Sequence, residues 1–207
     1  MDTVYVKSYK APEYNYNEIL RYAKISEDSD DIRTLINSCI SELNDKLQYY
    51  ICYREYPISF LSNKSQKDND SNAINLGFMT TTSSNLSKNL EGCTHIIVFA
   101  ATIGIHIDRL ISKYSASSPS KGIIMHAIGN ERIESLCNMF NNDIILEKRE
   151  LGHTTKPRFS PGYGDFDILA QKDIFEALNC PKNIGLTLND NMLMSPSKSV
   201  TAIIGIR

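Results

Sequence analysis

The chain has 207 residues, of which 42% are hydrophobic and 22% charged, and its net charge is −2, as in an ordinary soluble globular protein. It contains no long basic run and no stretch of about 18 apolar residues, which excludes non-specific nucleic-acid binding and a membrane span from the expected properties. The five scattered cysteines form no CxxC motif, and no signal-peptide pattern opens the chain, so we expect reduced thiols in a cytoplasmic protein.

The N-terminal quarter of the chain predicts two helices followed by a strand. Residues Asn15 to Lys24 have a short helical pattern, and Asp30 to Tyr49 have the clearest one. The apolar residues of this second segment recur at helical spacing on one face: Ile32, Leu35, Ile36, Cys39, Ile40, Leu43 and Leu47. From Tyr49 to Phe60, aromatic and β-branched residues predominate, which predicts a strand.

A polar segment separates this strand from its expected partner. Residues Ser62 to Asn72 are almost all polar and predict an exposed loop or hairpin tip. Residues Ala73 to Phe78 are expected to return as the partner strand, and Ser83 or Ser84 to cap a helix that runs to Leu90.

A continuous apolar run from Cys93 to Gly104 predicts a buried strand, which leads into a helix over Ile105 to Tyr114. A turn from strand to helix is a common place for ligands. However, the chain has neither GxGxxG nor GxxxxGK[ST], so neither a dinucleotide fold nor a phosphate-binding loop is supported.

The second half of the chain predicts two helices, a loop and a final strand. A long helix is expected from Ser120 to Phe140, and a loop from Gly152 to Gly164. The next helix spans Ile168 to Leu178 with Asp167 as its N-cap, and Cys180-Pro181 closes it; the last strand begins at Lys198. Helices and strands are mixed without a regular βαβ rhythm, so we predict a single α+β domain over residues 1–207.

No catalytic constellation or metal site is predicted. The four histidines share no HExxH or HxH spacing, and no GxSxG motif is present. The 24 acidic residues are too many and too dispersed for a catalytic pair to be recognised.

The segment RFSPGYGD, residues 158–165, combines an arginine, an aromatic residue and two glycines. Gly162 and Gly164 can adopt positive φ and turn consecutive amides inward as an anion-binding nest, to which the following helix adds its free N–H groups. Arg158 is a planar donor suited to a carboxylate, and Tyr163 offers a ring face and a hydroxyl. This pattern fits a small-molecule site, but a purely structural turn also explains the glycines.

The same segment resembles the activation domain of cobalamin-dependent methionine synthase, whose loop has the pattern Arg-x-x-x-Gly-Tyr, here Arg158 to Tyr163. The resemblance continues through Gln171-Lys172 to MSPSKSV at residues 194–200, which is similar to the family's Met-x-Pro-x-x-Ser-Val, and it covers residues 120–207 at motif level. It implies a mainly antiparallel twisted sheet with flanking helices.

The resemblance also implies S-adenosylmethionine as the ligand and cobalamin as a cofactor that a partner protein carries. The residues that it implies for the ligand site are Glu134, Arg158, Ser160, Pro161, Gly162 and Tyr163. Implied partners are a methionine synthase core and a flavodoxin- or ferredoxin-like electron donor, with the chain acting in trans as a reactivation subunit. Two alternatives remain open: a stand-alone enzyme that uses S-adenosylmethionine or another nucleotide, and a scaffold that binds only a partner.

Overall fold

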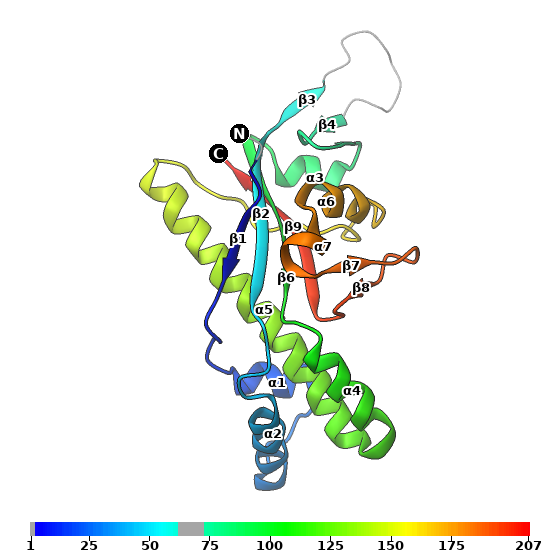
Figure 1. Cartoon of the computed structure of the whole chain (residues 1–207). Helices are drawn as coiled ribbons and strands as arrows, with labels where there is room; N and C mark the ends of the chain where they lie inside the picture. The colour runs from blue at the N-terminus through cyan, green and yellow to red at the C-terminus, as the bar shows by residue number, and fades with distance from the viewer. Residues whose placement is uncertain (1–2, 62–72) are drawn as a thin grey trace.

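The computed structural model describes residues 3–61 and 73–207, and its central element is a four-stranded antiparallel sheet. The strands are β1 (Tyr5–Ser8), β2 (Tyr50–Pro57), β6 (His95–Thr102) and β9 (Ser199–Ile206), in the order β1-β2-β6-β9. Four segments far apart in the sequence therefore meet in one sheet, and β9 forms one of its edges (Figure 1).

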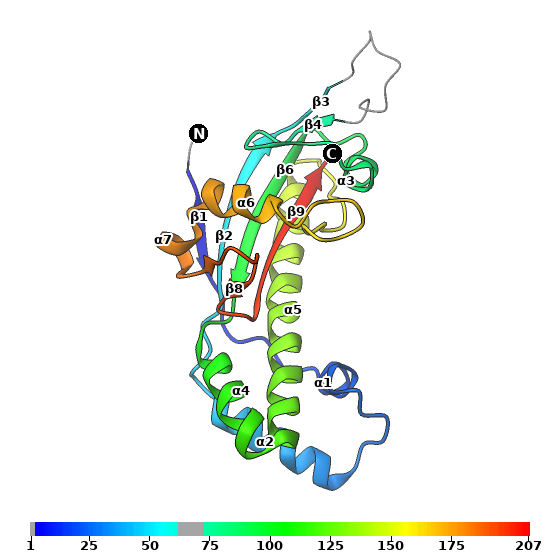
Figure 2. The same ribbon diagram turned by 90° about the vertical axis from the view of Figure 1, so that its right-hand side faces the viewer.

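The helices cover both faces of this sheet (Figure 2). The helices are α1 (Tyr16–Ala23), α2 (Asp30–Leu43), α3 (Ser84–Asn89), α4 (His106–Ser117), α5 (Pro119–Glu150), α6 (Ala170–Leu178) and α7 (Cys180–Ile184). Five short strands complete the described structure: β3 (Ser59–Leu61), β4 (Ala73–Asn75), β5 (Thr80–Thr81), β7 (Thr187–Leu188) and β8 (Met194–Ser195). The predicted α+β class and the antiparallel sheet with flanking helices are confirmed.

Apolar residues of β6 divide the interior into two clusters because successive side chains of a strand point to opposite faces. Ile97 and Phe99 belong to the cluster under α5, and Ile96 and Val98 to the cluster under α6. All four side chains are almost fully buried. Burial on both faces explains why the run in β6 is continuously apolar.

Helix α5 is the longest element and extends well beyond the predicted end at Phe140. It begins with Pro119 in its first turn and continues to Glu150. The sequence Asn141-Asn142-Asp143 concealed the continuation, but Phe140, Ile144 and Lys148 remain buried at four-residue spacing. Lys148 Nζ donates a hydrogen bond to Glu55 Oε2 on β2 at 2.8 Å, so Lys148, although polar, also faces the sheet.

Two other predicted boundaries in the first half of the chain were wrong. The helix predicted from Asp30 to Tyr49 ends at Leu43, because Asn44 is extended and Asp45 is left-handed at φ 58°. The strand predicted from Ala73 to Phe78 stops at Asn75, although it does pair with β3. The predicted loop Ser62–Asn72 lies outside the described residues.

The start of α6 also differs from the prediction. Asp167 is not its N-cap: the cap is Leu169, and the Asp167 carboxylate instead accepts a hydrogen bond from the Leu169 amide at 2.9 Å. After α6, the chain adds the short helix α7, and β7 and β8 then form a two-stranded sheet. Neither of these elements was predicted, and each is too short to show a clear hydrophobic period.

A buried ion pair on α5 holds the segment that precedes α1. The side chains of Glu131 and Arg132 are 1% and 0% exposed, and Arg132 Nη2 lies 2.6 Å from Glu131 Oε1. Arg132 also donates to the carbonyls of Pro12 and Glu13 at 2.5 and 2.7 Å, and its guanidinium lies 3.8 Å from the Tyr14 ring centroid. The N-terminal segment is therefore fixed to the centre of α5.

Candidate functional site

Five of the six predicted site residues line one pocket of about 320 Å³ beside the edge strand β9. The lining comes from α5, the 158–163 loop, α6, β8 and β9: Glu134, Arg158, Phe159, Ser160, Pro161, Tyr163, Gln171, Met194, Ser199, Val200 and Thr201. Gly162, the sixth predicted residue, lies in the loop but does not line the pocket. A volume of this size suits a small organic ligand.

The two charged residues of the pocket form an ion pair across its rim. Arg158 Nη2 lies 2.5 Å from Glu134 Oε2, and Arg158 Nη1 donates to Asn138 Oδ1 at 2.9 Å. Glu134 and Asn138 are one turn apart on α5, so the helix presents two acceptors to one planar guanidinium. With side-chain exposures of 26% for Arg158 and 40% for Glu134, both groups remain accessible to a ligand.

The loop backbone adopts the predicted positive φ but does not form the predicted nest. Gly162 and Gly164 have φ of 89° and 56°. However, the Gly162 amide donates to the Phe166 carbonyl at 2.7 Å, and the Tyr163 amide donates to the Ser160 carbonyl at 3.2 Å. These amides close the turn, so the inward-facing nest predicted from them is wrong.

The predicted contribution from the next helix is wrong for a similar reason. Helix α6 begins at Ala170, six residues after Gly164, rather than directly after the loop. The amides of Ala170 and Gln171 donate to the carbonyls of Asp167 and Ile168, both at 3.1 Å. The first turn of α6 therefore has few free amides with which to attract an anion.

Gly164 and Asp165 fasten the loop to α3. The Asp165 carboxylate accepts hydrogen bonds from the Ser83 hydroxyl and from the amides of Ser84 and Asn85, the last two at 2.7 and 3.0 Å. The bond from Ser83 and those from the two amides lower the pKa of Asp165. A Cβ on Gly164 would lie 2.3 Å from Asn85 Nδ2, so a larger residue would have to displace the Asn85 side chain as well as adopt φ 56°.

Two polar side chains of the pocket are buried without a partner. Gln171 on α6 is 6% exposed and Thr201 on β9 is 3% exposed. Within the described part of the chain, neither Gln171 Oε1 nor Thr201 Oγ1 has a hydrogen-bond partner. Gln171 was noted in the sequence as a family position, and Thr201 was missed. A single threonine inside an apolar strand was the only signal for it.

Backbone groups of the segment before the pocket pair with the outer edge of β9. Beside the pocket itself, this edge is left unpaired by the described residues. Ile203 exchanges two backbone hydrogen bonds of 2.8 Å with Phe159, and the Gly205 carbonyl accepts from the Lys156 amide at 2.9 Å. Alternate residues of an edge strand direct their backbone groups away from the sheet, so Thr201 follows Ile203 in doing so. Among the described residues, Phe159 is the last residue of this segment that hydrogen-bonds to the β9 backbone, and Thr201, two residues before Ile203, lines the pocket.

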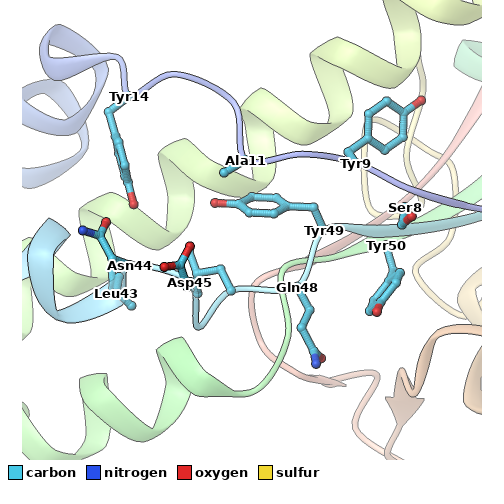
Figure 3. Close-up of a pocket in the computed structure, with 11 residues that line it drawn as sticks. Ser8, Tyr9, Ala11, Tyr14, Leu43, Asn44, Asp45, Gln48, Tyr49 and Tyr50 are labelled. Carbon is cyan, nitrogen blue, oxygen red and sulfur yellow. The ribbon is translucent and has the colours of Figure 1, made fainter.

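A second pocket, of about 380 Å³, lies on the side of the N-terminal segment and shares no residue with the first (Figure 3). The rings of Tyr14, Tyr49 and Tyr50 and the side chain of Asp45 surround it. The Tyr14 ring is already covered by Arg132. Among the described residues, no buried side-chain atom of this pocket is left without a partner, so the pocket beside β9 is the stronger candidate.

Neither a metal cluster nor a membrane span is found in the described part of the chain. No group of three or more His, Cys, Asp or Glu side chains there is arranged to hold a metal ion. None of the described helices has both the length and the apolar character needed to cross a bilayer. All five cysteines are buried and free.

The chain matches a family model and is similar to solved structures. Residues 16–206 match the family model described as "Vitamin B12 dependent methionine synthase, activation domain". The chain is also similar to the crystal structure of "the MetH Reactivation Domain bound to AdoHcy", with a TM-score of 0.64 over 98% of this chain and 78% of that chain. At 15% identity, this likeness shows the fold alone. A comparison with curated proteins gives no match.

Proposed function

The chain belongs to the family of vitamin B12 dependent methionine synthase activation domains, and from this premise we propose that it binds S-adenosylmethionine in the pocket beside β9. We propose further that it supports reductive methylation of cob(II)alamin held by a methionine synthase core, acting in trans. The observation that carries the proposal is that Glu134 and Arg158, 24 residues apart in sequence, meet at the rim of one pocket with the Arg-x-x-x-Gly-Tyr loop.

The two charged residues match the amino-acid end of this ligand. S-adenosylmethionine carries a carboxylate and an ammonium group on the same carbon, so it offers Arg158 an anion and Glu134 a cation. In the structure these residues neutralise each other, with 2.5 Å between Arg158 Nη2 and Glu134 Oε2. The ligand would replace one ion pair with two, and charge-assisted bonds of this kind are among the stronger ones in proteins.

The loop would hold the remainder of the ligand against the protein. Pro161 is buried and stiffens the loop, Ser160 contributes a hydroxyl, and Gly162 sets the turn that places both beside Tyr163. The Tyr163 ring is 69% exposed and packs edge-on against Phe159, with 6.3 Å between their centroids. An exposed ring at the rim is suited to contact a sulfonium from one side while the other stays open.

When bound, S-adenosylmethionine would supply its sulfonium methyl for transfer to the partner's cobalamin, once one electron has reduced that cobalamin from the cob(II) form, and S-adenosylhomocysteine would be the other product. Arg158, Glu134 and the loop bind and orient the donor so that its methyl group faces solvent, where the partner docks. The partners are a cobalamin-dependent methionine synthase core and a flavodoxin- or ferredoxin-like electron donor. We place the protein in the cytoplasm, with which five free buried cysteines are compatible.

Reactivation in trans is tested by mixing the chain with a cobalamin-loaded core that lacks its own activation domain, a one-electron reductant and S-adenosylmethionine. We expect the cob(II)alamin absorbance to fall and methionine synthesis to resume at least about tenfold faster than without the chain. Omitting either the chain or the methyl donor should abolish this gain. Recovery at the same rate without the chain, or methylation of a small substrate by the chain alone, contradicts the proposal.

The shape of the loop is tested by replacing Gly162 with alanine. Positive φ at Gly162 and a Cβ only 3.2 Å from Ile168 Cδ1 should cost about 1–2 kcal/mol of stability and displace the loop, weakening ligand binding. Gly152→Ala is the matched control, since Gly152 has φ 81° with open space around it. Urea unfolding and titration calorimetry should show destabilisation of both variants but weaker binding only for Gly162→Ala. Unchanged binding by that variant would contradict a role for the turn.

A further inference from the structure

The two buried polar side chains without partners, Gln171 and Thr201, come from different elements and both line the same pocket, whose buried side, made by these two residues, we call its floor. Leaving such a group unpaired costs free energy, and native structures contain few of them. Their convergence on one pocket, where the open edge of β9 at Thr201 adds backbone groups, indicates that a ligand completes their hydrogen bonds.

The part of the ligand that reaches this floor follows from the charges at the rim, and this step rests on the proposed function. Arg158 and Glu134 lie at the accessible side and hold the amino-acid end. The methyl group must face the partner, so the nucleoside is the part that points inward. Phe159 and Met194 line the same pocket and offer apolar surface to a flat ring.

We propose that Gln171 reads the base of the ligand by pairing its amide with N6–H and N7 of adenine. A primary amide presents an acceptor oxygen beside a donor nitrogen, and this pair matches the adenine edge that carries an N6 donor next to the N7 acceptor. Thr201 completes the floor with a hydroxyl that both donates and accepts, so it holds the nucleoside without distinguishing one base from another.

The proposal makes Gln171 the residue that selects adenine over hypoxanthine. Hypoxanthine presents two acceptors, O6 and N7, on the same edge. Whichever orientation the Gln171 amide takes, its acceptor oxygen would face one of the two acceptors of hypoxanthine. A site that hydrogen-bonds a donor of its ligand rejects the analogue that lacks the donor, because buried polar groups are left unpaired.

Titration calorimetry with S-adenosylhomocysteine and S-inosylhomocysteine tests this selection on the full chain. Wild type should bind the adenosyl compound about tenfold to a hundredfold more tightly. In Gln171→Met, which keeps the length of the side chain but removes both polar groups, the two affinities should agree within about threefold. Thr201→Val is the matched control, and it should weaken both ligands while the ratio between them stays that of wild type.

The outcomes separate the two proposals. If wild type binds the adenosyl compound but binds the inosyl compound equally well, the role of Gln171 is overturned and the proposed function stands. If Gln171→Met weakens both ligands and keeps the wild-type ratio, the role of Gln171 is likewise overturned. If wild type binds neither ligand near millimolar concentration, the proposed function itself fails. The comparison of two ligands on wild type needs no variant to fold.

Discussion

Replacing Arg158 with alanine is expected to weaken S-adenosylmethionine binding by about 30-fold to 1,000-fold, which corresponds to about 2–4 kcal/mol. The guanidinium is the cation that the pocket offers to the ligand carboxylate, and it is already held in place by Glu134 and Asn138. Without it, the ligand carboxylate would face Glu134, and the attraction between opposite charges would be replaced by repulsion.

Titration calorimetry on wild type, Arg158→Ala and Arg158→Lys measures this effect. Lysine keeps the charge but not the planar fork, so its affinity should lie between the other two. Arg149→Ala is the control, because Arg149 is an exposed arginine in the last turn of α5, and its removal should leave the affinity unchanged. Equal affinities for wild type and Arg158→Ala would show that the carboxylate is held elsewhere.

Replacing Arg132 with methionine is expected to lower the free energy of unfolding by about 3–5 kcal/mol. The variant leaves the Glu131 carboxylate, 1% exposed, without its cation in the interior. It also removes the donors to the carbonyls of Pro12 and Glu13, so the segment before α1 loses its attachment to α5. The loss of the cation falls in the interior, since Glu131 and Arg132 are both almost fully buried.

Urea unfolding of Arg132→Met and of Arg21→Met compares a buried arginine with an exposed one. Arg21 forms an i,i+3 pair with Glu18 on the surface of α1, and its loss should cost far less stability than the loss of Arg132. Adding Glu131→Gln to Arg132→Met should restore part of the stability, because no lone charge then remains buried. A loss as small as that of Arg21→Met would mean that the pair contributes nothing to the fold.

Sequence patterns predicted the elements that have a clear period or a cap. Helix α1 was expected over Asn15 to Lys24 and spans Tyr16–Ala23, and Asn15 is its cap, because the Asn15 side chain accepts a hydrogen bond from the Glu18 amide. Strand β6 was recognisable from its continuous apolar run. The exposed four-residue strand β1 was not predicted, since none of its side chains is buried and its place in the sheet depends on pairing with β2.

The sequence predicted part of the candidate site, and its residues were found in different ways. Arg158 and Tyr163 belong to a motif that can be read along the chain, whereas Glu134 was found only through the resemblance to a family. The pairing of Glu134 with Arg158 arises because folding brings α5 next to the loop. No local sequence pattern predicts that these two residues meet. That Gln171 and Thr201 lack partners is likewise a property of the folded chain, because it depends on what surrounds them.

The segment from Gly152 to Gly164 lies along β9, and this position gives it a second role in protecting the edge of the sheet. Thr155 and Phe159 pair with Ile206 and Ile203 as isolated bridges, and so cover the outer edge of a strand that is buried almost throughout. An uncovered edge of this kind can pair with the edge of another molecule and start aggregation. Insertions or substitutions in this segment therefore affect solubility as well as the ligand, and the range of sequences that it can accept is limited by both.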